Sequence, residues 1–153
     1  MRGPSILVPF DGSRAARVAF AHAVQLAALR GGRVTLLGVV SEQPLGVAAA
    51  LFTPPVLCAD EAEAELARLM QSAREELGGR VPVCAVIRRG RWRDEVLARV
   101  IAAEHDLVVV AGMGRKQRRL AARCPVPVIV LRDNRRARVR RRLRVAGGRA
   151  RTA

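Results

Sequence analysis

Five short apolar segments that alternate with four segments of helical character constrain the fold of this chain more than any other feature. Strands that alternate with helices predict a parallel sheet whose two faces are covered by right-handed crossover connections. In such sheets, ligands bind beyond the carboxyl ends of the strands, at the point where the strand order reverses. The expected strands are residues 5–10, 33–40, 80–90, 106–112 and 126–131.

The segments between these strands carry the start and stop signals of helices. Ser13 can cap the first helix because its hydroxyl can accept a hydrogen bond from an amide of the first turn, and a glycine pair ends that helix. Asp60 and Glu63 resemble a capping box at the start of the second helix. Residues 41–59 contain three prolines and a glycine, so we expect an irregular segment there. The expected helices are residues 14–30, 60–77, 92–105 and 116–123.

The composition fits a single domain with an aliphatic core. Of the 153 residues, 50% are hydrophobic but only 3% are aromatic, so Val, Leu, Ile and Ala must fill the core. No apolar run approaches the ~20 residues that span a bilayer, and the N-terminus lacks the length of a secretory signal. We therefore expect a cytoplasmic protein. Cys58, Cys84 and Cys124 form no metal-binding pattern, so we expect buried free thiols and no metal site.

Positive charge is concentrated at the C-terminal end of the sequence. The net charge is +15, and residues 132–153 supply +9 of it through ten arginines and one aspartate. We expect a domain of residues 1–131, followed by an arginine-rich tail, residues 132–153, that does not pack and is disordered. Such a tail can contact nucleic-acid phosphates in a salt-dependent manner or rest on an acidic membrane surface. It can also be an accessory segment with non-specific stickiness, or reflect a coding bias toward arginine.

Three segments together resemble the universal stress protein family. They are ILVPFDGS at residues 6–13, HDLVVVAGMGR at residues 105–115 and CPVPVIVLR at residues 124–132. The resemblance implies a single doubly wound α/β domain with a five-stranded parallel sheet in the order 3-2-1-4-5, of the adenine nucleotide alpha hydrolase-like type. It also implies a homodimer formed through the last strand, here Val126 to Leu131.

The glycine turn after the fourth strand departs from the pattern of the family's ATP-binding members. Those members carry G-x-x-G, nine residues and then G-[S/T], and the backbone amides of this motif favour phosphate. Here Ala111 takes the first glycine position and Gly114 the second, and a Cys-Pro pair stands where the final pair should be. Gly112 and Gly114 can offer amides to phosphate from one side. The opposite wall would come from flexible, solvated basic side chains such as Arg115, whose ordering costs entropy.

The nucleoside end of the family site is better preserved. Pro9 lies near the end of the first strand and Asp11 follows that strand, where the resemblance places an aspartate that contacts the nucleoside. Asp11 can instead bond its own backbone in a turn. Val39 and Val40, at the end of the second strand, can offer backbone groups to a base. Neither histidine has a patterned nucleophile or acid partner, and we expect His105 to be a helix-end residue.

These observations predict a non-catalytic regulatory or binding module with weak or absent ATP binding. The first alternative is an ATP-binding member of the family, in which basic side chains hold the phosphates. The second alternative is a protein that binds nucleic acid through its arginine-rich tail.

Overall fold

Five parallel strands form one sheet in the computed structural model, which describes residues 2–41, 55–112 and 114–132. The strands are β1 (Ser5–Pro9), β2 (Arg33–Val40), β3 (Val83–Arg89), β4 (Leu107–Ala111) and β5 (Val128–Leu131). The helices are α1 (Arg14–Arg30), α3 (Pro55–Leu77), α4 (Trp92–Ala102) and α5 (Arg115–Arg123). The strand order β3-β2-β1-β4-β5 confirms the predicted order. None of the described helices is both long enough and apolar enough to cross a membrane.

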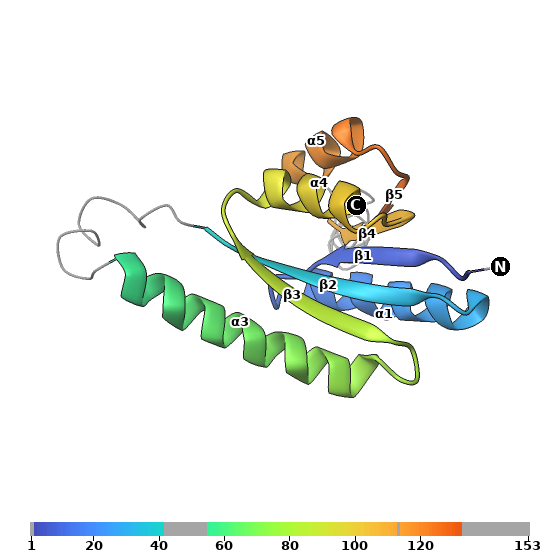
Figure 1. Cartoon of the computed structure of the whole chain (residues 1–153), viewed down its shortest axis with the longest axis horizontal. Coiled ribbons are helices and arrows are strands. Elements are labelled where there is room, and N and C mark those ends of the chain that lie inside the picture. The colour runs from blue at the N-terminus through green and yellow to red at the C-terminus, as the bar shows by residue number, and fades with distance from the viewer. Residues whose placement is uncertain (1, 42–54, 113, 133–153) are drawn as a thin grey trace, which may run out of the picture.

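Two apolar clusters lie on opposite faces of the sheet. Successive strand side chains point to opposite faces, so Ile6 and Val8 enter the cluster under α1 and α3, whereas Leu7 enters the cluster under α4 and α5 (Figure 1). Phe20 of α1 and Met70 of α3 are almost completely buried in the first cluster. Because helices cover both faces, the central strands are apolar on both sides and appear in the sequence as continuous hydrophobic runs.

Helix α1 begins and ends as predicted. The Oγ atom of Ser13 accepts a hydrogen bond from the Ala16 amide at 3.2 Å, which satisfies one of the unpaired donors of the first turn. Gly31 follows the helix with a φ of 63°, in the left-handed region, and its amide donates to the Ala27 carbonyl. A residue without a Cβ atom adopts this conformation at no steric cost.

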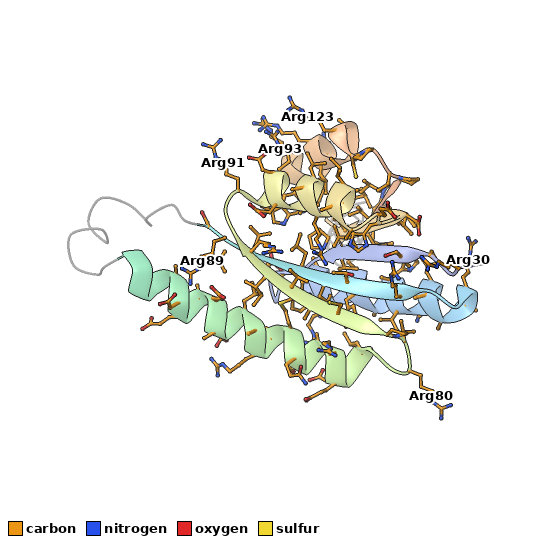
Figure 2. The ribbon with its side chains drawn as sticks, in the orientation of Figure 1. Arg30, Arg80, Arg89, Arg91, Arg93 and Arg123 are labelled. Atoms are coloured by element: carbon orange, nitrogen blue, oxygen red, sulfur yellow. The ribbon has the colours of Figure 1, made fainter. Side chains whose placement is uncertain are left out.

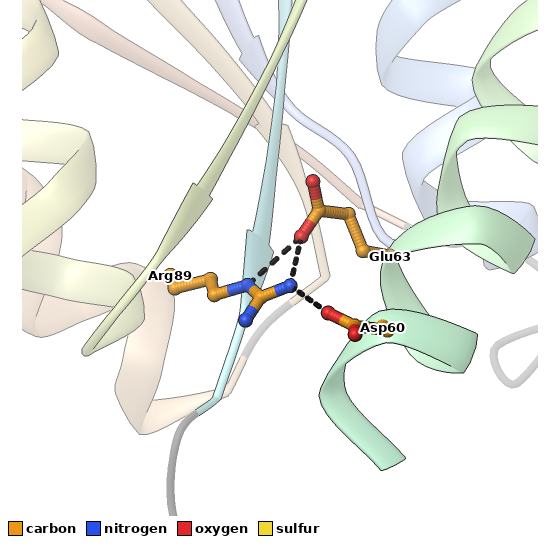
Figure 3. A network of polar contacts seen from close by, with 3 residues as sticks. All are labelled: Asp60, Glu63 and Arg89. Carbon is orange, nitrogen blue, oxygen red and sulfur yellow. Dashed lines mark hydrogen bonds and ion pairs between the residues drawn. The ribbon is translucent and has the colours of Figure 1, made fainter. Parts of the chain in front are cut away.

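Helix α3 starts at Pro55, earlier than the predicted start at residue 60. Proline suits a first turn because the amide that it lacks would have no partner within the helix. Asp60 and Glu63 therefore lie inside the helix, and the predicted capping box is wrong. Both carboxylates instead pair with Arg89 at the end of β3, whose Nε donates to Glu63 at 2.8 Å (Figure 3). These hydrogen bonds, with Asp60 the larger contributor, raise the pKa of Arg89 and tie α3 to the carboxyl end of β3.

Two predictions about single residues are wrong. Helix α4 ends at Ala102, so His105 lies beyond the helix, where it is buried and paired with a serine hydroxyl. Cys84 is exposed because β3 is an edge strand, and Cys124 is only half-buried. The side chain of Cys58 and residues 133–153 of the predicted tail lie outside the described residues.

Candidate functional site

The strand order reverses between β1 and β4, and two cavities lie near the carboxyl ends of these strands. The smaller cavity, about 100 Å³, is lined by the end of β1, the start of α1, the end of β4 and the first turns of α4 and α5. The larger cavity, about 330 Å³, is lined by residues of α5 and by the segment that opens α4. Trp92 and Lys116 line both cavities. We define the two cavities together as the carboxyl-end site.

The turn after β1 places Asp11 at the wall of the smaller cavity, together with Pro9. The Asp11 Oδ1 atom accepts a hydrogen bond from the Ser13 amide at 2.9 Å, so this carboxylate forms the turn that its position in the sequence allows. Gly12 has a φ of 80° between them, which explains why a glycine stands in this turn. Asp11 is exposed, so its carboxylate is accessible from the cavity while it holds the turn.

Lys116 separates the two cavities. Its Nζ atom lies 4.2 Å from the centroid of the Trp92 ring, a distance at which an ammonium group is attracted to the face of an indole. Burial lowers the pKa of Lys116, and the negative charge of Asp11 opposes that shift. Lys116 is nevertheless an exposed residue, as expected for the basic residues of α5, although its ammonium group lies against the Trp92 ring. By contrast, Arg91 and Arg93 at the start of α4 extend outward from the body (Figure 2).

The glycine turn between β4 and α5 has one backbone amide that is already hydrogen-bonded within the sheet. The Gly112 amide donates to the Leu131 carbonyl at 2.9 Å, so it extends the ladder between β4 and β5. Gly114 is the N-cap residue of α5 and provides no side-chain cap. Gln117 covers the turn from α5: its Nε2 atom donates to the Ala111 carbonyl at 3.4 Å, and its Oε1 atom is buried without a hydrogen-bond partner among the described groups.

The other predicted site residues lie away from the cavity walls. Gly112, Gly114 and Arg115 are not among the residues that line either cavity. Val40 is buried, and its carbonyl accepts a hydrogen bond from the Gly90 amide at 3.0 Å. Val39 packs against the apolar cluster under α4 and α5.

Sequence reasoning did not assign Trp92 and Gln117 to this site. The signal was present, because both residues open a helix that directly follows a strand, at Trp92–Ala102 and Arg115–Arg123. In a parallel sheet, such helix starts lie at the carboxyl edge, where ligands bind. Among the described residues, no three His, Cys, Asp or Glu side chains gather closely enough to hold a metal ion.

A doubly wound parallel sheet with a polar cavity at its switch point defines a class of α/β ligand-binding domains. The sequence model of the universal stress protein family matches residues 4–132. This chain belongs to the universal stress protein family.

Solved structures support this assignment of the fold. The universal stress protein UspA of Lactobacillus plantarum superposes with a TM-score of 0.75 at 24% identity, over 86% of this chain and 99% of that one. A universal stress family protein of Burkholderia pseudomallei gives a TM-score of 0.71 at 22% identity, over 84% and 95%. A universal stress family protein of Arabidopsis thaliana with AMP bound gives 0.64 at 16% identity, over 88% and 94%. No curated protein matches the chain significantly.

Proposed function

We propose that this protein is a non-catalytic binding module of the universal stress protein family that binds ATP weakly or not at all. The observation that carries the proposal is the engagement of the Gly112 amide by Leu131 at 2.9 Å. A triphosphate needs several donors that converge from two sides. Here the Gly112 amide is engaged in the sheet, and a Cys-Pro pair replaces the G-[S/T] pair that would supply the second set of amides in the family's ATP-binding members.

The groups that remain in the carboxyl-end site suit a nucleoside with a short phosphate chain. Asp11 offers a carboxylate to hydroxyl or amino groups, and Lys116 places a single positive charge beside the Trp92 ring. The Arabidopsis relative was solved with AMP bound, which is a ligand of this size. We therefore infer that a nucleoside monophosphate binds this chain about as well as ATP does.

Calorimetric titration with Mg-ATP tests the proposal. We expect no saturable binding tighter than about 1 mM, which corresponds to about −4 kcal/mol. Asp11→Ala is the matched variant, because it removes the carboxylate at the cavity wall. Saturable micromolar binding that disappears in Asp11→Ala would contradict the proposal.

A second candidate function is ATP binding with basic side chains as the opposite wall. The position of Lys116 and Arg119 favours this candidate, because both residues line the larger cavity and could contact a phosphate chain bound there. Ordering such long side chains costs up to about 2 kcal/mol each, so this arrangement binds more weakly than a backbone cradle. In the same titration, this alternative predicts micromolar binding that is weakened by Lys116→Gln.

We also propose that two copies associate through residues 126–131. Strand β5 lies at the sheet edge, and the Val108 and Gly112 amides donate to the Pro127 and Leu131 carbonyls at 3.0 and 2.9 Å. Because backbone groups alternate along a strand, those of Val128 and Val130 face the open edge. This edge can therefore pair with a second chain.

Light scattering after size exclusion should give the mass of a dimer. Val130→Pro should shift the protein toward a monomer, because it removes an outward-facing amide while sparing the bonds to β4. A melting temperature close to that of the wild type is the control for folding. A strict monomer of the wild type at every concentration would refute this association.

Two expectations from the sequence stay predictions: the division into a domain and a tail at residue 132, and the cytoplasmic location.

A further inference from the structure

A second cleft lies at the other end of the sheet, beside the amino ends of β1, β2 and β3. Its volume is about 580 Å³, larger than either cavity of the carboxyl-end site. The last turns of α3 and α4 and the segment that follows each helix complete its walls. Its main polar lining residues are Ser5, Arg33, Thr35, Arg74, Arg99 and His105. We call it the amino-end cleft.

The amino-end cleft carries an excess of positive charge. Arg33, Arg74 and Arg99 come from three different elements, and none of the described residues that line the cleft is acidic. These three arginines also take no part in the ion pairs found among the described residues. The Nε atom of Arg99 is buried and has no hydrogen-bond partner among the described groups. Such a cluster is uncompensated within the part of the chain that the structure describes.

His105 adds a second buried polar atom without a partner. Its side chain belongs to a residue that is only 5% exposed, and its Nε2 atom makes no hydrogen bond to a described group. The Nδ1 atom lies 2.9 Å from Ser5 Oγ, and Arg33 Nε donates to the same oxygen at 3.2 Å. The serine hydroxyl accepts from Arg33 and keeps its proton and a second lone pair for Nδ1, so it fits either tautomer of the neutral ring. In the tautomer in which Ser5 donates to Nδ1, Nε2 carries the ring proton and is a donor that a bound anion would accept from.

The surroundings of His105 favour an anion over a cation. Burial, then the charges of Arg99 and Arg33, lower the pKa of His105, while Asp106 opposes them. The Oδ2 atom of Asp106 accepts the Ser5 amide at 2.8 Å, so this carboxylate is engaged with the backbone. Arg74 of α3 and the Cys84 thiol of β3 complete the titratable groups of the described lining. Ser5 is 4% exposed, which makes it a poor nucleophile for chemistry with His105.

We propose that the amino-end cleft binds phosphate, either as the inorganic ion or as the phosphate group of a small metabolite. The oxygens of one phosphate can accept from the Nε2 proton of His105 and from Arg99, the two buried donors that lack partners. Arg33 and Arg74 then balance the remaining negative charge. Guanidinium groups match phosphate geometry because their donors are held in a planar fork. This inference does not depend on the proposed function, because the cleft and the carboxyl-end site share no described lining residue.

Nitrogen-detected NMR of the full-length protein tests the proposal, with inorganic phosphate as the probe. The chain has two histidines, so His22 on α1 is an internal reference for His105. In the titration, phosphate replaces chloride at constant ionic strength. The Nε2 signal of His105 should shift in a saturable manner, and the ring signals of His22 should not shift. Bound phosphate adds negative charge, so the pKa of His105 should rise from its lowered value. A small phosphomonoester as a second probe distinguishes a metabolite site from a site for the inorganic ion.

Arg99→Gln should weaken phosphate binding at least about tenfold, because it removes a positive charge and the guanidinium donors. Arg30→Gln is the matched control: Arg30 is exposed on the last turn of α1, outside the cleft lining, and its side chain extends away from the body (Figure 2). Arg33→Gln serves as a second variant if Arg99→Gln does not fold, and it should also weaken binding. The proposal would be overturned if neither probe shifts the Nε2 signal of His105. It would also be overturned if Arg30→Gln weakens phosphate binding as much as Arg99→Gln does.

Discussion

Phe20→Ala should lower the free energy of unfolding by about 3–5 kcal/mol, the range for a large core aromatic truncated to alanine. Phe20 is 0% exposed and lies in the cluster between the sheet and helices α1 and α3. The chain is 3% aromatic, so few other side chains have the volume to fill the resulting cavity. Chemical denaturation followed by circular dichroism measures the change.

Leu29→Ala on the same helix is the matched control. Leu29 is 82% exposed, so its truncation removes little buried surface and should change stability by less than about 0.5 kcal/mol. A loss of less than about 1 kcal/mol for Phe20→Ala would mean that α1 does not pack on the sheet as described.

Gly38→Ala should cost about 1–3 kcal/mol, because the new methyl group overpacks a tight contact. A Cβ atom at Gly38 of β2 would lie 2.5 Å from Leu66 Cδ2 and 3.1 Å from Met70 Sδ, both on α3. The Leu66 side chain must therefore move aside, which in a densely packed core forces it against its other neighbours. The absence of a Cβ atom at this position therefore sets how closely α3 approaches the sheet.

A double-mutant cycle with Leu66→Ala isolates this contact. Leu66→Ala alone should cost about 2–5 kcal/mol, and the double variant should cost less than the sum by at least about 1 kcal/mol. The reason is that alanine at position 66 makes room for the new methyl group. Additive losses would show that the two positions are not in contact.

Local sequence signals predicted those parts of the fold that neighbouring residues determine. Ser13 and the glycine at position 31 fix both ends of α1 through contacts within a few residues, so the predicted bounds are those observed. The start of α3 was misjudged because Pro55 is compatible both with a loop and with a first helical turn. Asp60 and Glu63 have capping-box spacing, but their partner is Arg89, which only the folded structure brings close.

The candidate site depends more on contacts between distant residues. The sequence indicated Asp11 because it follows the first strand, and the structure places it at the cavity wall. It did not indicate that the Gly112 amide is used by Leu131, because this bond requires β5 to pair alongside β4. The pairing of His105 with Ser5 joins residues separated by 100 positions, and no local pattern predicts it.

We propose that the carboxyl-end site gains little binding free energy from the β- and γ-phosphates of a nucleotide. Both the engaged Gly112 amide and the missing glycine-serine turn act on that part of a ligand. We therefore expect ATP and AMP to differ little in affinity for this site. Lys116 carries one positive charge beside Trp92, and this charge can attract the phosphate of AMP as well as a phosphate of ATP.

The most direct test is a comparison of dissociation constants for AMP, ADP and Mg-ATP by calorimetry on the same preparation, with competition experiments for the weaker ligands. We expect ATP to bind no more than about threefold tighter than AMP, a difference in binding free energy below about 1 kcal/mol. ATP that binds tenfold or more tightly than AMP, with a steady gain from AMP through ADP to ATP, would contradict it.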